Sequence, residues 1–230
     1  MNKIKIPTFF GTIVAIDTDT RITEDLQKFG HWEFNDLLQI LDYCPDTQGT
    51  IIDIGCNIGT WLIPMAQRYK SNKFLALDCQ QVTIDCVNES LQINSITNVD
   101  TECCIVSDHC ETIKQHFINY DWAANFGAYE VEHPYVNSDF NGRTTNQTYQ
   151  ALVKTIDSFN INDVVFIKID VEGMEYKVLV GAQETIKRCK PIIVFENHKT
   201  NLDFIKKLLL DLDYYLLDNE IGQMNIAHPL

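Results

Sequence analysis

The chain has 230 residues, with 18 Lys+Arg against 32 Asp+Glu, so its formal net charge is −14. With 45% hydrophobic and 22% charged residues, the composition is typical of a globular protein and excludes the disordered and fibrous classes. The acidic charge disfavours nucleic acid and anionic membrane surfaces as partners, because their phosphate groups bind Lys and Arg.

The N-terminal residues 1–48 predict a strand or hairpin followed by a helical segment. The segment Met1–Phe10 starts with a weak positive charge and continues with apolar residues, but Pro7 and Gly11 interrupt it and no cleavage site follows. We therefore expect a short strand or hairpin rather than a signal peptide. From about Arg21 to Cys44, apolar residues recur at spacings of three and four, which predicts helix.

After a loop at Pro45–Gly49, strands and helices alternate. Strands are predicted at Thr50–Ile54, Lys73–Leu77, Thr101–Val106, Val164–Ile169 and Pro191–Phe195. Helices are predicted at Thr60–Tyr69, Gln81–Ile93, Met174–Arg188 and Asn201–Leu212. The alternation indicates a mostly parallel sheet covered on both faces. A closing hairpin of Tyr214–Leu217 and Met224–Ala227, joined by residues 219–222, would add one antiparallel strand.

The segment at about 120–148 does not fit this alternation. It contains Gly127, Pro134 and Gly142 and many Asn, Ser and Thr residues. Long excursions of this kind are often functional, so we expect an insertion near the site, with little core of its own. The prediction is one domain, 1–230, in which an N-terminal segment, 1–48, precedes a Rossmann-like core, 49–230, that carries the insertion.

The chain has eight cysteines and no Cys-x-x-Cys pair, which disfavours a zinc ribbon or a redox motif. Several of them lie in apolar runs and are expected to be buried and reduced, which predicts a cytoplasmic protein. No apolar run approaches the ~18 residues of a membrane span, so no membrane insertion is expected.

The segment Ile51–Thr60 reads IIDIGCNIGT, a strand followed by a glycine turn and a helix. In open α/β folds, ligands bind at this carboxyl edge of the sheet. The glycines do not have the spacing of a dinucleotide fingerprint, which disfavours a nicotinamide-dependent dehydrogenase. Asp53 could reach an ammonium group, while Gly55 and Gly59 let the backbone approach closely, so the turn suits a ligand with an amino acid and a ribose.

Acidic residues at two other strand ends extend this prediction. Asp78 ends the second strand, 19 residues after Gly59, where an acid accepts hydrogen bonds from ribose hydroxyls. Ser107 and Asp108 end the third strand and are expected beside the base. Together with the glycine turn, these residues predict a nucleoside site.

The segment Lys168–Glu175 reads KIDVEGME and places three acids and a lysine at the end of a buried strand. Charged residues there need partners or a ligand. We interpret Asp170 and Glu172 as functional. Glu175 also fits a first-turn acid of the following helix, and Lys168 fits an ion-pair partner of one carboxylate.

The motifs DIGCNIG at 53–59, KIDVEGME at 168–175 and PIIVFE at 191–196 resemble the FkbM family of S-adenosylmethionine-dependent methyltransferases. Phe29–Glu33, which reads FGHWE, resembles the segment that precedes the first motif in that family. The resemblance implies a Rossmann-like, seven-stranded class I methyltransferase fold with an antiparallel C-terminal hairpin. It also implies O-methylation of a sugar, a glycan or another small molecule. One departure is Asp78-Cys79, where the family usually has Glu-Pro.

The residues expected to bind S-adenosylmethionine come from the turn, the strand ends and the N-terminal motif. They are Glu33, Asp53, Gly55, Asn57, Gly59, Thr60, Asp78, Cys79, Ser107 and Asp108. Methyl transfer to a hydroxyl also needs a proton acceptor. The candidates at the carboxyl edge are Asp170, Glu172, Glu196 and His198.

Asp170 and Glu172 could also hold Mg²⁺, which prefers oxygen ligands, but a metal is not favoured. Two alternatives remain open: a non-catalytic S-adenosylmethionine-binding partner protein, and a methyltransferase for another acceptor class. A nucleic-acid methyltransferase is opposed by the −14 charge and by the lack of an Asn-Pro-Pro-aromatic motif.

Overall fold

The computed structural model describes residues 1–133, 139–217 and 221–230. The strands of its main sheet are β3 (Thr50–Ile54), β4 (Lys73–Asp78), β5 (Val99–Cys103), β9 (Val164–Ile169), β10 (Ile192–Glu196), β11 (Tyr214–Leu216) and β12 (Met224–Pro229). Within the described ranges these seven strands have the order β11-β12-β10-β9-β3-β4-β5. The five strands from β10 to β5 are parallel, and β12 pairs antiparallel with both β10 and β11. The predicted fold class is confirmed, including the antiparallel C-terminal hairpin.

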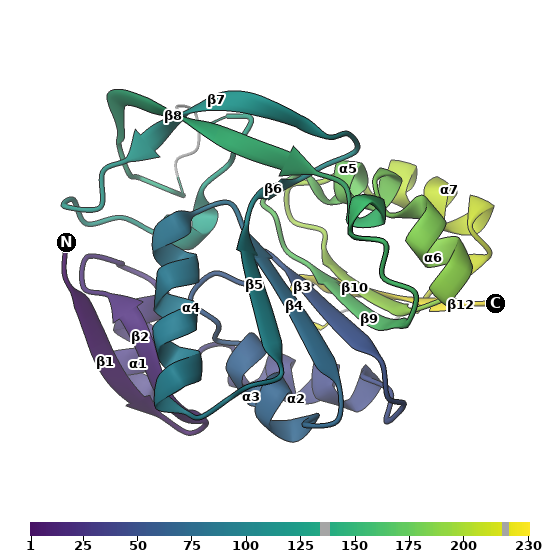
Figure 1. The fold of residues 1–230 in the computed structure, drawn as a ribbon, viewed down its shortest axis with the longest axis horizontal. Coiled ribbons are helices and arrows are strands. Elements are labelled where there is room, and N and C mark those ends of the chain that lie inside the picture. The colour runs from purple at the N-terminus through teal and green to yellow at the C-terminus, as the bar shows by residue number, and fades with distance from the viewer. Residues whose placement is uncertain (134–138, 218–220) are drawn as a thin grey trace.

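Helices cover both faces of the main sheet (Figure 1). One face packs against α2 (Phe34–Tyr43), α3 (Leu62–Arg68) and α4 (Gln81–Ile93). The other packs against α5 (Glu175–Val180), α6 (Gln183–Cys189) and α7 (Leu202–Asp211). Neighbouring strand residues turn to opposite faces, so Ile51 joins one core and Ile52 the other. Burial on both faces explains why these strands read as continuous apolar runs.

Two helices predicted as continuous are each divided in the structure. The segment 21–44 forms α1 (Ile22–Phe29) and α2, because Gly30 ends α1 in a left-handed conformation and donates its N–H to the Leu26 carbonyl. The segment 174–188 forms α5 and α6, with Gly181 between them. A Cβ atom at Gly181 would lie 2.1 Å from the Ser107 carbonyl oxygen, so this break lets two backbone segments approach closely.

The third predicted strand, 101–106, is also divided. Its last part, β6 (Ile105–Val106), leaves the main sheet and pairs with β8 (Thr144–Lys154), which pairs in turn with β7 (Glu111–Ile118). This second sheet lies beyond the carboxyl end of β5 (Figure 1). The segment predicted as an insertion therefore follows β7 and ends within β8. Residues 134–138 of that segment, and Asn219 and Glu220 of the predicted final turn, lie outside the described residues.

The expectation that the insertion has little core of its own is wrong. Its residues Ala124, Phe126, Tyr129 and Phe140 are buried in one cluster with the N-terminal hairpin and α1. That hairpin consists of β1 (Lys3–Thr8) and β2 (Gly11–Ile16), as predicted. The Asn, Ser and Thr content of the segment did not reveal these aromatic anchors, because their partners in the N-terminal hairpin lie more than a hundred residues away in the sequence.

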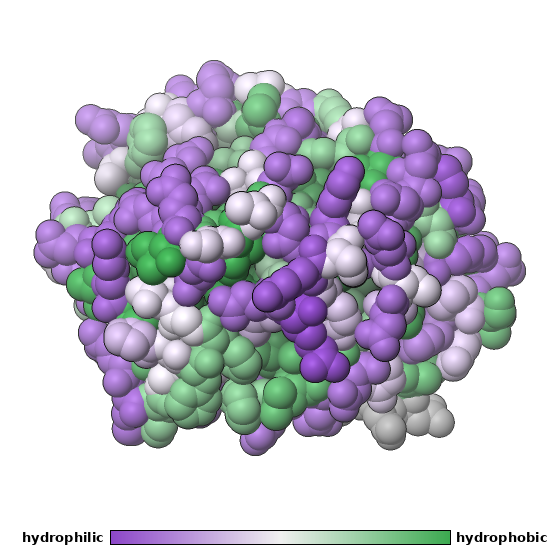
Figure 2. Space-filling view, turned by 60° about the horizontal axis from the view of Figure 1, so that its bottom comes forward, coloured by the Kyte–Doolittle hydropathy of each residue, from purple (hydrophilic) through white to green (hydrophobic). Residues whose placement is uncertain are grey.

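On the face drawn in Figure 2, hydrophilic residues predominate and hydrophobic residues form smaller groups between them. Within the described residues, no helix is both long and apolar enough to cross a membrane.

Gly55, which follows β3, offers a test of the packing between β3 and β9. It has φ +78°, and a Cβ atom there would lie 1.8 Å from the Asp170 carbonyl oxygen. Gly59 has φ +86°, but a Cβ atom there would meet only side-chain carbons of Ile63 and Val87 at 3.4 Å or more. In both alanine variants, the left-handed backbone conformation should lower the free energy of unfolding by ~1–2 kcal/mol. Gly55→Ala should lower the free energy of unfolding by a further ~1–3 kcal/mol, because the new Cβ atom would displace the Asp170 backbone, whereas at Gly59 it meets only side chains. Urea denaturation measures both values, and equal losses would contradict the backbone contact.

Candidate functional site

A cavity of about 480 Å³ lies at the carboxyl edge of the main sheet. Its floor is formed by the residues that follow β3, β4, β9 and β10. Its other walls come from the N-terminal segment and from the insertion. The volume lies within the range of ~300–1,000 Å³ that is usual for small-molecule and cofactor sites.

One end of the cavity is built by the glycine turn and Asp78. The N–H groups of Gly55 and Cys56 donate to the Leu77 carbonyl, at 2.8 and 3.1 Å, which fixes the turn beside β4. The Asp78 carboxylate accepts from the Asn57 N–H at 2.9 Å. It also accepts from the Gln80 N–H and the Thr83 hydroxyl, each at 2.8 Å. Burial raises the pKa of Asp78, and these three donors act against the rise. Hydrogen bonds therefore join the turn and the acid into one unit.

Asp53 lies behind the cavity wall and pairs with Lys168. The Lys168 Nζ atom is 3.3 Å from Asp53 Oδ1, 3.4 Å from Asp170 Oδ2 and 5.6 Å from the centroid of the Trp61 ring. Asp53 is 3% exposed, and burial raises its pKa while the Lys168 charge lowers it. Burial also acts to lower the pKa of Lys168, but the charges of Asp53 and Asp170 outweigh it, so that pKa is raised. Lys168, and not Asp53, lines the cavity.

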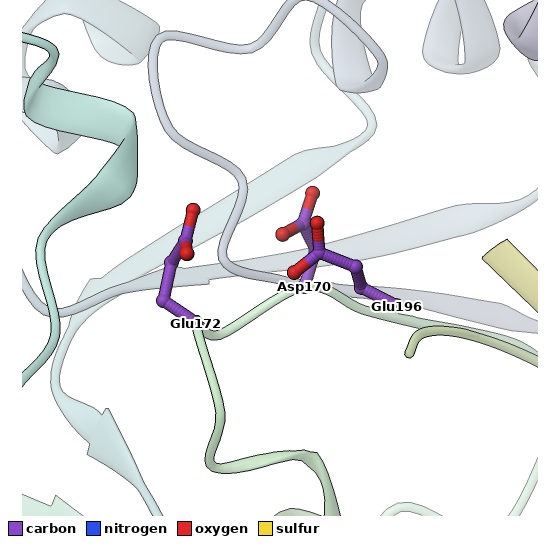
Figure 3. Close-up of side chains that lie close together, drawn as sticks. All are labelled: Asp170, Glu172 and Glu196. Carbon is purple, nitrogen blue, oxygen red and sulfur yellow. The ribbon is translucent and has the colours of Figure 1, made fainter. Parts of the chain in front are cut away.

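Three carboxylates converge in the same cavity. Asp170 follows β9, Glu172 lies in the next loop with φ 55°, and Glu196 ends β10. One ligand atom from each lies within 4.8 Å of the others, and the side chains extend to the same side of the strand ends (Figure 3). Among the described residues, Glu196 Oε2 has no hydrogen-bond partner. Burial raises the pKa of Glu196 well above its usual range, and the charges of Asp170, Glu172 and Glu175 add to this rise.

This acidic trio, defined as Asp170, Glu172 and Glu196, permits two kinds of chemistry. Carboxylates held together bind a proton more tightly than separate ones, which suits a group that accepts a hydroxyl proton near neutral pH. Three convergent carboxylates could also hold a hard divalent cation such as Mg²⁺. His198, the fourth candidate, lines the same end of the cavity with an exposed side chain.

The N-terminal segment contributes a wall beside the acidic trio. Glu33 has a left-handed backbone with φ 44° and begins α2. Its side chain is exposed toward the cavity, yet desolvation by the surrounding protein and the Asp170 charge raise its pKa to about 7. Next to it, the Arg21 guanidinium lies 5.3 Å from the centroid of the Trp32 ring, and both residues line the cavity.

Most of the predicted cofactor-binding residues line this cavity, and four do not. Glu33, Gly55, Asn57, Thr60, Asp78 and Cys79 are in the wall. Asp53, Gly59, Ser107 and Asp108 are not in the wall. Ser107 is buried against Gly181, and Asp108 is exposed and pairs with His109 at 2.6 Å. The residues before them, Cys104, Ile105 and Val106, line the cavity instead.

Several lining residues were not anticipated from the sequence. They are Arg21, Trp32, Trp61, Gln80, Asn125, Tyr129, Asp139, Lys199 and Gln223. Gln80 follows Asp78 closely, and it joins the insertion by donating to the Phe126 carbonyl at 2.9 Å and accepting from the Tyr120 hydroxyl at 2.8 Å. Lys199 follows His198 directly in the sequence, so its position next to that candidate could have indicated it as a site residue. Trp32 and Trp61 likewise adjoin the candidates Glu33 and Thr60 in the sequence, whereas Arg21, Asn125, Tyr129, Asp139 and Gln223 reach the cavity through tertiary packing.

Comparisons with known proteins bear on the family and the fold of this chain. The methyltransferase FkbM domain family matches residues 53–222. The crystal structure of a methyltransferase FkbM from Methylobacillus flagellatus KT has a TM-score of 0.56 and 16% sequence identity. That match covers 79% of this chain and 43% of the other, so this chain spans less than half the length of that protein. A precorrin-6y C5,15-methyltransferase from Geobacter metallireducens GS-15 has a TM-score of 0.48 and 11% identity, covering 83% of this chain and 84% of the other. A search of curated proteins found no match.

The buried pair of Lys168 and Asp53 provides a test of the site's electrostatics. Lys168→Met leaves the Asp53 charge buried without its partner, which should lower the free energy of unfolding by ~3–5 kcal/mol. Without Lys168, the pKa of Asp53 in the folded state rises further above its unfolded value, so stability is retained at low pH and lost as pH increases. The loss should therefore be smaller at pH 5 than at pH 8 in urea denaturation. The double variant Lys168→Met/Asp53→Asn should recover most of the stability, and a double variant no more stable than Lys168→Met would contradict the pairing.

Proposed function

The chain belongs to the FkbM methyltransferase family, and we propose that it transfers the methyl group of S-adenosylmethionine to a hydroxyl oxygen of a sugar, a glycan or another small molecule. One observation carries this proposal. A single cavity is lined by Asp78, a strand-end acid that is hydrogen-bonded to the glycine turn, and by three convergent carboxylates. The first arrangement suits a nucleoside, and the second suits a reacting hydroxyl.

The residues present fit the proposed cofactor. A carboxylate has about four acceptor positions, so Asp78 can accept from ribose hydroxyls in addition to the three donors that fix it. Gly55 and Asn57 bring backbone to the cavity next to Asp78. Because Asp53 is behind Lys168, contact with the ammonium group of the cofactor falls to Asp170 and Glu33, which line the cavity. The bound cofactor supplies an electrophilic methyl group on a sulfonium.

The protein's own contribution is to position the acceptor and to remove its proton. As the new C–O bond forms, the hydroxyl oxygen becomes more acidic and its proton passes to a carboxylate of the acidic trio or to His198. Burial, together with repulsion between the carboxylates, raises the pKa of Glu196 and increases the affinity of the trio for a proton. Holding the acceptor oxygen in line with the methyl group accounts for the rest of the rate enhancement.

A Mg²⁺-assisted reaction is the second candidate, and the 4.8 Å convergence of the three carboxylates favours it. In that arrangement Asp170, Glu172 and Glu196 would hold the ion, which would make the bound hydroxyl more acidic. The carboxylates would then act as ligands rather than as the proton acceptor.

Amide substitution tests the role of the trio, since it removes charge and preserves shape. Glu172→Gln and Glu196→Gln should each lower methyl transfer ~10²-fold, the usual effect of losing a general base. Transfer is measured with labelled methyl donor on a panel of sugars, and S-adenosylhomocysteine affinity, measured by calorimetry, should change little. Asp108→Asn is the matched control, because Asp108 is exposed and does not line the cavity.

Chelation separates the two versions of this reaction. Activity that persists in EDTA indicates direct proton transfer, and activity that EDTA removes and Mg²⁺ restores indicates a metal site. Full activity in both amide variants would remove the trio from the mechanism. Binding of S-adenosylmethionine without transfer to any acceptor would instead support a non-catalytic partner protein.

A further inference from the structure

Lys199 joins three segments of the chain at the acceptor end of the cavity. Its Nζ atom lies 2.6 Å from Glu172 Oε2, 2.9 Å from Glu130 Oε1 and 4.0 Å from Asp139 Oδ2. Glu172 belongs to the loop after β9, whereas Glu130 and Asp139 belong to the insertion. The Lys199 side chain is 16% exposed, and those of Glu172 and Glu130 are each 18% exposed. Lys199, Glu172 and Asp139 all line the cavity.

This arrangement leaves Lys199 without spare positive charge. Glu172 alone would neutralise it, and Glu130 adds a second carboxylate at hydrogen-bond distance. Lys168 is held in the same way between Asp53 and Asp170. Among the described lining residues, Arg21 is the remaining Lys or Arg, and its exposed side chain is screened by water. An anionic group that entered this end of the cavity would meet carboxylates.

Anchoring of the insertion does not require Glu130. The insertion is held by its buried aromatic residues Phe126, Tyr129 and Phe140. Two residues after Glu130, Glu132 forms an ion pair with Lys177, which does not line the cavity. Partly buried ion pairs carry a desolvation cost and are weak stabilisers, so stability alone does not explain a second carboxylate on Lys199.

We propose that Glu130, with Asp139, determines the charge selectivity for the acceptor: by adding negative charge around Lys199, which Glu172 alone would neutralise, these residues exclude acceptors with a carboxylate or phosphate and select uncharged hydroxyl compounds. This inference rests on the proposed function and narrows its substrate class. Selectivity of this kind comes from repulsion of the wrong ligand as well as attraction of the right one. Glu130 acts through Lys199, so it is a specificity-determining residue and not a catalytic one.

Methyl transfer to matched sugars with and without a carboxylate tests the proposed charge selectivity directly. The probes are methyl β-D-glucopyranoside with methyl β-D-glucopyranosiduronate, and the corresponding galactose pair. Wild-type protein should methylate the neutral member ~10-fold or more faster, because like charges at close range are strongly disfavoured. Glu130→Gln removes one of the carboxylates around Lys199, while Glu172 still pairs with it, and this loss of negative charge should lower the ratio ~10-fold. Glu132→Gln, which removes one charge from the same segment, should leave the ratio unchanged.

A binding measurement makes the test independent of turnover. The His198 ring resonances of the protein loaded with S-adenosylhomocysteine are followed while sodium sulfate or methyl glucopyranosiduronate replaces chloride at constant ionic strength. Wild type and Glu132→Gln should show no saturable shift, and Glu130→Gln should show one. Unchanged S-adenosylhomocysteine affinity verifies that each variant is folded.

The outcomes separate this inference from the proposed function. The charge selectivity would be overturned if wild type methylated the carboxylated sugars faster than the neutral ones. It would also be overturned if wild type showed a saturable anion shift equal to that of Glu130→Gln. Neither result would contradict methyl transfer itself. Absence of an anion shift in Glu130→Gln would overturn it as well. If no sugar of either kind is methylated, the proposed acceptor class is wrong, and the anion titration still decides whether Glu130 controls charge.

Discussion

The carbonyl oxygen of Asp170 lies 1.8 Å from the place where a Cβ atom at position 55 would be, and the site depends on this close approach. The Asp170 N–H donates to the Ile54 carbonyl at 3.0 Å, so β3 and β9 stay paired to their last residues. The glycine turn after β3 and the acidic loop after β9 therefore open into the same cavity. A side chain at position 55 would separate them.

Charge balance is the second constraint on this edge of the sheet. Carboxylates that lose water need a cation or a proton to remain buried. Lys168 balances Asp53 and Asp170, and Lys199 balances Glu172 and Glu130. Glu196 lacks a comparable partner in the described part of the chain, and its pKa rises accordingly. The two lysines thus pair with four of these carboxylates and leave Glu196 without a cation.

The sequence predicted the parts of the fold that local patterns encode. Buried parallel strands read as apolar runs, so β3, β4, β9 and β10 were placed within one or two residues of their observed bounds. Once those strands were placed, the acids at their ends, such as Asp78 and Asp170, could be predicted to lie near one another, because parallel strands bring their carboxyl ends to one edge of the sheet. The family motifs lie in this same part of the chain, and the family match confirms them.

What the sequence did not predict depends on distant partners. The two residues of β6 cannot be assigned to a sheet by periodicity, since their pairing with β8 spans almost fifty residues. That departure from the main sheet is also why Cys104–Val106 line the cavity and Ser107 and Asp108 do not. The contact of Lys199 with Glu130 likewise requires the insertion to fold back over the strand ends, and no local pattern encodes that.

A crystal structure with S-adenosylhomocysteine is the most direct test of how this cavity is used. The predicted result places both ribose hydroxyls within hydrogen-bond distance of the Asp78 carboxylate, with the sulfur atom directed toward Asp170 and Glu196. A ribose bound away from Asp78, or a sulfur atom directed away from these carboxylates, would contradict the assignment of the two ends of the cavity.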